Sequence, residues 1–181
     1  MAVIIDIIGA AIIVGIILLA IFGLNANLNQ ASYNKNFSLI VQTNTVTLAR
    51  MIEYDFVKIG FHTPRPCILA ATSDSISFMA DLGNDGTVHA VQYYVSPVSV
   101  LGTTKNPRDR LIYRVEDGEV IAANLGLTSL ALSYFDGYGN VTSSPDSIRS
   151  IDVRFKVESP EPVDTGYIAS FWQKRIYPRN L

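Results

Sequence analysis

The chain has 181 residues, 49% of them hydrophobic, and a formal net charge of −2 at pH 7. Its 14 basic residues are balanced by 16 acidic ones, so no basic field is available to hold phosphates, and nucleic acid is excluded as an expected partner. The single cysteine, Cys67, excludes an intrachain disulfide. Because Pro66 and Ile68 flank it, we expect a buried small hydrophobic side chain rather than a reactive thiol.

The first predicted element is an apolar helix. Residues 3–24 read VIIDIIGAAIIVGIILLAIFGL, and Asp6 is their only charge. At about 1.5 Å of rise per residue this stretch extends for about 33 Å, enough to cross a hydrocarbon core of about 30 Å. We predict a transmembrane or filament-core helix over residues 1–25. The alternative, a cleaved signal peptide, fits poorly because neither a basic segment nor a small-residue cleavage site frames the apolar run.

Asp6 is the unusual residue of this helix. An ionised carboxylate near the centre of a membrane costs about 2.5–3.5 kcal/mol, so it requires a partner or a place near water. In a structural interpretation, the side chain reaches the interface and favours the positive end of the helix dipole. In a functional interpretation, removal of Met1 before the small residue Ala2 makes Asp6 the fifth residue of the mature chain.

A second helical segment is predicted over residues 26–61. Steps of three and four residues connect one stripe of apolar or near-apolar positions, which is typical of an amphipathic helix. The stripe comprises Phe37, Val41, Thr45, Leu48, Ile52, Phe56 and Ile59. No proline occurs before Pro64, and Gly60 begins the segment that predicts the end of the helix. We therefore expect one continuous helix of about 55 residues, far longer than an ordinary globular helix.

Residues 62–181 predict a β-rich globular domain. Short apolar or alternating runs predict strands at 68–71, 75–80, 87–95, 110–115, 119–123, 127–135, 148–157 and 167–176. The Asp117–Gly118 pair predicts a hairpin. Half-polar alternation is typical of antiparallel strands that place one face on a core. We expect the sheet to pack on the apolar stripe of the helix, which gives an α+β fold.

The order of these segments resembles the type IV pilin and pseudopilin superfamily. Members begin with an apolar helix that carries an acid at position five, usually Glu, where this chain has Asp6. The later segments are similar to those of minor pilins and J-type minor pseudopilins: FMAD at 78–81 before the GNDG turn, YY at 93–94, LIYR at 111–114, LSYFD at 132–136 and PRNL at 178–181. No basic leader ending in Gly precedes the apolar run.

The resemblance implies a structural subunit, of the minor pilin or pseudopilin kind, that assembles through its N-terminal helix into an extracellular or periplasmic filament. It implies that the Asp6 carboxylate meets the N-terminal ammonium of a neighbour, with Ala2 as the first mature residue. The side chains expected in the filament core are Ile4, Ile8, Ile12, Ile16, Leu19 and Phe22.

The partners implied by the resemblance are identical or related pilin-like subunits, membrane lipid before assembly, and the assembly platform and motor of the inner membrane. The chain would cross that membrane once, with its globular domain outside the cytoplasm. A second interpretation stays open: a permanently anchored single-span protein whose domain binds a partner in a secretion complex or a viral membrane.

Neither interpretation predicts an enzyme or a cofactor. His62 and His89 lie in separate segments without metal-ligand spacing. The sequence contains neither a nucleotide-binding loop nor a nucleophile motif.

Two further groups of residues are candidate sites. The DLGNDG segment at 81–86 places three oxygen-bearing side chains in five residues, a composition that suits a weak Ca²⁺ site. It lacks the spacing and closing Glu of an EF-hand, and the same residues favour a plain turn, which is our preferred interpretation. The aromatic group Tyr134, Phe135 and Tyr138 is expected to lie in the core rather than on a binding surface.

Overall fold

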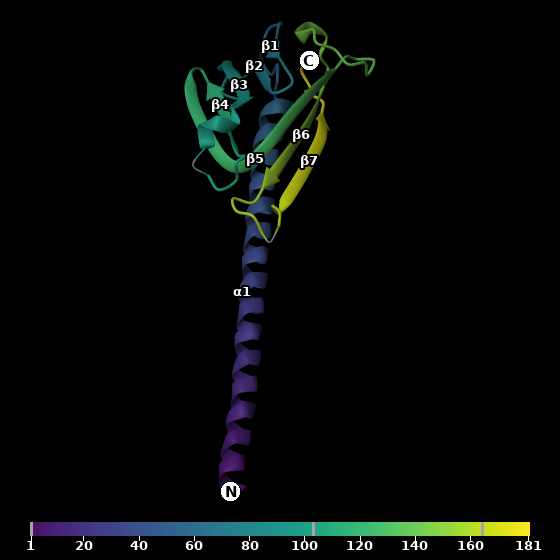
Figure 1. The fold of residues 1–181 in the computed structure, drawn as a ribbon. Coiled ribbons are helices and arrows are strands. Elements are labelled where there is room, and N and C mark those ends of the chain that lie inside the picture. Colours follow the sequence, from purple (N-terminus) through teal and green to yellow (C-terminus); the bar gives the residue numbers. More distant parts are fainter. Residues whose placement is uncertain (1, 103, 164) are drawn as a thin grey trace. The chain divides into compact units, whose positions relative to one another are not determined.

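The computed structural model describes residues 2–102, 104–163 and 165–181, and for Ala2 it describes the backbone alone. One long helix, α1 (Ala2–Val57), precedes a sheet of seven strands (Figure 1). The strands are β1 (Ile68–Ala71), β2 (Ser75–Ala80), β3 (His89–Val95), β4 (Arg110–Glu116), β5 (Glu119–Phe135), β6 (Ser150–Glu158) and β7 (Ala169–Ile176). Two short 3₁₀ helices, η1 (Val98–Leu101) and η2 (Pro145–Ser147), complete the elements. The predicted α+β fold is confirmed.

The chain divides into two compact units, one ending at residue 37 and the other covering residues 38–181. The described part of the first unit is entirely helical, and its only aromatic contact is between the rings of Tyr33 and Phe37, whose centroids are 6.4 Å apart. The helix is uninterrupted because no proline removes a backbone donor along it.

In the second unit the strands form an antiparallel meander in which each strand pairs with the next one in the sequence. The connection between β4 and β5 consists of only two residues. The predicted hairpin between β4 and β5 is confirmed, and Asp117 and Gly118 both have positive φ, at 46° and 89°. Positive φ at both central residues is typical of the hairpin turn whose twist matches that of the flanking strands.

The core of the second unit lies between the sheet and the part of α1 that follows residue 37. The sheet curls around this part of the helix (Figure 1). Of the predicted stripe, Phe37 is only half-buried, whereas Val41, Thr45, Leu48, Ile52, Phe56 and Ile59 are all at most 6% exposed. The ring of Phe56 packs edge-to-face on those of Phe78 and Tyr93, at centroid distances of 5.8 and 5.5 Å. Helical periodicity therefore identified the buried face of α1 correctly.

A buried ion pair also connects α1 to the sheet. The Asp55 carboxylate, which is 3% exposed, accepts hydrogen bonds from the Tyr93 hydroxyl at 2.5 Å and from Nε of Arg114 at 2.7 Å. Nη1 of Arg114 donates to Glu116 at 2.7 Å. Burial, reinforced by the negative charge of Asp55, raises the pKa of Tyr93 well above its usual value, so the phenol stays a donor.

The prediction of two separate strands at 119–123 and 127–135 is wrong, because β5 runs without interruption over 17 residues. Its first part pairs with β4 and its second part with β6, and both pairings shift register near Leu127. Gly126 stands at this shift with a φ of +68°. The irregularity is a bulge that allows the strand to change partner without ending.

The remaining differences concern element ends. The helix stops at Val57, and β3, β6 and β7 each begin two residues after the predicted start. Gly60, with a φ of +78°, lies in the turn that follows the helix.

Candidate assembly surface on the N-terminal helix

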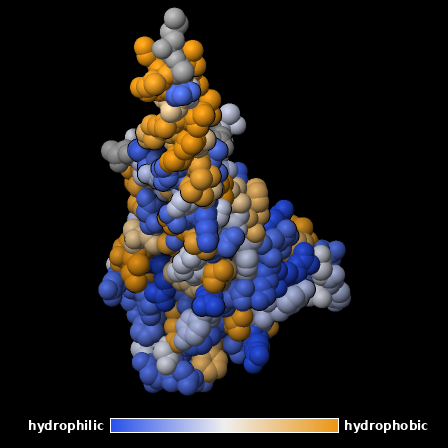
Figure 2. Space-filling view, turned by 90° about the horizontal axis from the view of Figure 1, so that it is seen from below, coloured by the Kyte–Doolittle hydropathy of each residue, from blue (hydrophilic) through white to orange (hydrophobic). Residues whose placement is uncertain are grey.

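The helical unit that ends at residue 37 exposes an apolar surface. All sixteen Val, Ile, Leu and Phe side chains of residues 3–28 are between 47% and 72% exposed. Figure 2 shows hydrophobic residues crowded along this helix. A segment of 18 residues within α1 reaches a mean hydropathy of 3.0 with none of it buried, so the helix is long and apolar enough to cross a membrane.

The six residues predicted for a filament core lie on one face of this helix. At 3.6 residues per turn they fall within an arc of about 120°. Their exposed fractions range from 54% to 72%: Ile4, Ile8, Ile12, Ile16, Leu19 and Phe22. Other faces carry equally exposed apolar side chains, such as Ile7 and Ile13. The geometry offers apolar contact around the whole circumference, and the choice of these six stays a prediction.

Asp6 has an exposed side chain in the second turn of α1. It is rotated by about 200° from Ile4, which places it away from the face of the six core candidates. Its carboxylate makes neither a hydrogen bond nor an ion pair with any residue that the structure describes. Ala2 is the other predicted assembly residue, but its side chain, like Met1, lies outside the described part of the chain. The carboxylate is therefore accessible to a group from another molecule.

The turn at residues 81–86 uses its oxygen atoms internally. The Asp81 carboxylate is completely buried and accepts hydrogen bonds from the backbone N–H groups of Asp85 and Gly86, at 3.2 and 2.9 Å. Nδ1 of His62 lies 2.9 Å from the same carboxylate. Burial alone would raise the pKa of Asp81, but these hydrogen bonds outweigh it and hold the pKa below its usual value.

These contacts are those of a plain turn. Among the described residues, no three His, Cys, Asp or Glu side chains are grouped so that they could hold a metal ion. The sequence did not reveal the pairing of His62 with Asp81, or that of His89 with Asp117 at 2.6 Å, because each joins residues far apart in the chain.

The three residues of the predicted aromatic group differ in how far they are buried. Tyr134 is in the core as predicted, at 5% exposed, and its hydroxyl donates to the Thr72 carbonyl at 2.8 Å. Phe135 is half-buried beneath the guanidinium of Arg175, which lies 3.8 Å from the ring centroid. For Tyr138 the prediction is wrong: it is 94% exposed, because it follows β5 in a turn rather than lying in the strand. Cys67, at 4% exposed, is buried as predicted.

No protein-family profile matches the sequence, and no curated protein matches it.

Proposed function

We propose that this protein is a type IV pilin-like structural subunit, anchored in a membrane by its N-terminal helix before it assembles through that helix into an extracellular or periplasmic filament. The observation that carries the proposal is the exposed apolar surface of residues 3–28, which belongs to a helix that continues into a folded domain. The amphipathic second part of α1 with an antiparallel meander also supports it, since the pilin resemblance implies this arrangement.

The physical basis of assembly is the removal of this apolar surface from water. At about 25 cal/mol per Å², burying about 1,000 Å² of it contributes about 25 kcal/mol before entropic costs. A lipid bilayer covers the same surface equally well, so most of that gain disappears when the helix moves from membrane to filament. The transfer accordingly requires an assembly platform and a motor in the membrane.

Asp6 provides register between subunits in this proposal. A carboxylate inside a bundle of apolar helices is strongly disfavoured unless a cation is correctly placed beside it. The N-terminal ammonium of a neighbouring subunit, with Ala2 as the first mature residue, supplies that cation. Misaligned subunits would leave both charges unpaired in an apolar environment.

Shearing of cells tests the proposal. We expect the protein in the released filament fraction as well as in the membrane fraction. Recovery from membranes alone would contradict the proposal and would favour the permanently anchored, partner-binding protein.

Substitution of Asp6 tests the mechanism. Asp6→Asn keeps the size of the side chain but removes its charge, so we expect a folded, membrane-inserted protein that is absent from the filament fraction. Asp6→Glu keeps the charge and should still enter filaments. Glu119→Gln, at an exposed residue of β5, is the matched control for loss of one acidic charge. Normal incorporation of the Asp6→Asn variant would rule out the ion pair.

A further inference from the structure

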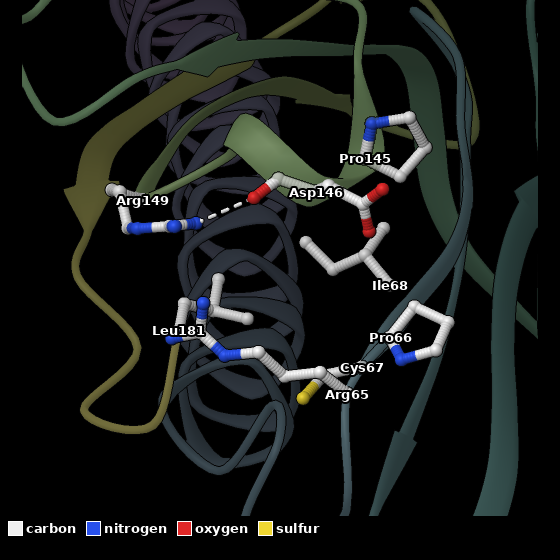
Figure 3. A pocket seen from close by; sticks show the side chains of 8 residues that line it. All are labelled: Arg65, Pro66, Cys67, Ile68, Pro145, Asp146, Arg149 and Leu181. Carbon is white, nitrogen blue, oxygen red and sulfur yellow. Dashed lines mark hydrogen bonds between the residues drawn. The ribbon is translucent and has the colours of Figure 1, made fainter.

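The unit of residues 38–181 contains a cavity of about 340 Å³ where three segments far apart in the sequence meet (Figure 3). The first segment follows the end of α1, the second includes η2, and the third is the end of the chain. The residues that line the cavity are Arg65, Pro66, Cys67, Ile68, Pro145, Asp146, Arg149 and Leu181. Its volume lies in the range typical of small-molecule sites, about 300–1,000 Å³.

Two guanidinium groups face this cavity. Nη1 of Arg149 donates to the backbone carbonyls of Asp146 and Ile148, at 2.9 and 2.7 Å, and these bonds hold the group in place. Arg65 makes neither a hydrogen bond nor an ion pair with any residue that the structure describes. Within the same described ranges, neither guanidinium has a carboxylate within 4.0 Å. Both cations are therefore available to an anion.

The other walls restrict the chemistry of that anion. The Asp146 carboxylate lies across the cavity from the two guanidinium groups (Figure 3). Pro66 and Leu181 contribute apolar surface, whereas Ile68 and the Cys67 thiol are buried. A ligand that fits has a carboxylate at one end, a hydrogen-bond donor at the other and an apolar face between them.

We propose that this cavity binds a small hydroxycarboxylate of the sugar-acid class. The ligand carboxylate accepts hydrogen bonds from Arg65 and Arg149, whose planar donors match a carboxylate. A ligand hydroxyl donates to the Asp146 carboxylate, and the apolar face of the sugar ring lies on Pro66 and Leu181. This binding site is independent of the filament proposal, since it involves no residue of the N-terminal helix.

Calorimetric titration of the full chain in detergent micelles tests the site, with glucuronate as the probe and glucose as the matched neutral sugar. We expect saturable binding of glucuronate and none of glucose. Arg65→Ala should weaken glucuronate binding about tenfold or more, since a charge-assisted hydrogen bond is lost. Arg65 is the appropriate position because its substitution removes neither a hydrogen bond nor an ion pair with any residue that the structure describes. Arg179→Ala, at an exposed arginine that does not line the cavity, should leave the affinity unchanged.

Acetate, which has a carboxylate but no hydroxyl, tests the role of Asp146. We expect acetate to bind more weakly than glucuronate, and Asp146→Asn to weaken glucuronate binding relative to acetate binding. Absence of glucuronate binding, equal binding of glucose, or an affinity insensitive to Arg65→Ala would each overturn the site. Acetate binding as tight as glucuronate binding would overturn the assignment to sugar acids.

Discussion

Two buried carboxylates in the unit of residues 38–181 differ in how their charges are satisfied. Glu158, 2% exposed, forms ion pairs with Lys156 at 2.5 Å and Arg108 at 2.8 Å. Burial alone would raise the pKa of Glu158, but hydrogen bonds from these cations outweigh it and lower the pKa. Asp109 is 3% exposed, and its Oδ1 has no hydrogen-bond partner among the described residues. Burial raises the pKa of Asp109, and the charge of Glu158 adds to the effect.

Replacement of Asp109 by Asn should stabilise the protein at pH 7 by about 1 kcal/mol, since it removes a buried charge without a full set of partners. The pKa of Asp109 is higher in the folded chain than its unfolded value of about 3.8, so its favourable contribution exists below that value and is lost as pH rises through the folded pKa. The gain from Asp109→Asn should therefore be present at pH 7 and vanish in acid.

Thermal unfolding of the full chain in detergent, at pH 7 and at pH 3.5, measures this effect. A rise in Tm of about 2–4 °C at pH 7 is expected. A lower Tm for the variant at pH 7 would contradict this prediction, because it would show that the charged Asp109 carboxylate stabilises the folded protein.

The backbone at Gly126 leaves no room for a side chain. Its φ is +68°, and a Cβ there would lie 2.5 Å from the carbonyl oxygen of Glu158. Gly126→Ala should therefore cost about 3 kcal/mol of folding free energy, from backbone strain together with displacement of the neighbouring strand. Gly86 has a φ of +86° but open space around a Cβ, so Gly86→Ala should cost only about 1 kcal/mol. Chemical denaturation of both variants separates the cost of backbone strain from the cost of the steric clash. Equal losses of folding free energy in the two variants would contradict the steric clash at Gly126.

Helix α1 is one element with two environments. Its residues up to 28 expose every large apolar side chain, whereas the stripe from Val41 onward is buried against the sheet. Packing of this stripe and the Asp55–Arg114 ion pair both hold the second part of α1 against the sheet. The stability of the second unit should therefore depend on the helix positions that face the sheet.

Phe56→Ala tests this dependence. The ring is 1% exposed, and its loss should leave a cavity that costs about 3–5 kcal/mol. Val46→Ala, at a residue of the same helix that is 47% exposed, should change the free energy of unfolding by less than about 0.5 kcal/mol. Urea denaturation monitored by Trp172 fluorescence measures both, and a small effect at Phe56 would show that the helix contributes little to the core.

For the molecule as a whole, the exposed apolar helix determines behaviour in water. Without detergent or lipid, the full chain should associate through residues 3–28, because their large apolar side chains are all exposed. The double substitution Ile12→Lys and Leu19→Lys should reduce the mass of the assemblies in light scattering. Lysines at Leu69 and Phe171, exposed apolar positions of the second unit, should not. A full chain that stays monomeric in water would contradict the assembly surface.

The sequence by itself determined the features that depend on local periodicity. The apolar helix, the buried stripe of its second part and the hairpin at Asp117–Gly118 are each encoded in neighbouring residues. Alternation predicts the strands, but a bulge interrupts the alternation near Gly126, and the sequence pattern does not distinguish a bulge from the end of a strand. The alternation of apolar and polar residues indicates which face of a strand is buried, but it does not indicate which strand lies beside it in the sheet.

Only the tertiary structure decided the features that join distant residues. Asp55 and Arg114 are 59 positions apart, and Arg65 and Arg149, the two arginines of the cavity, are 84 positions apart. Oδ1 of Asp109 likewise has no hydrogen-bond partner among the residues that the structure describes, and it is buried only because distant segments pack around it. Such contacts form only when folding brings residues from distant parts of the sequence together, and a pattern of neighbouring residues does not predict which ones will meet.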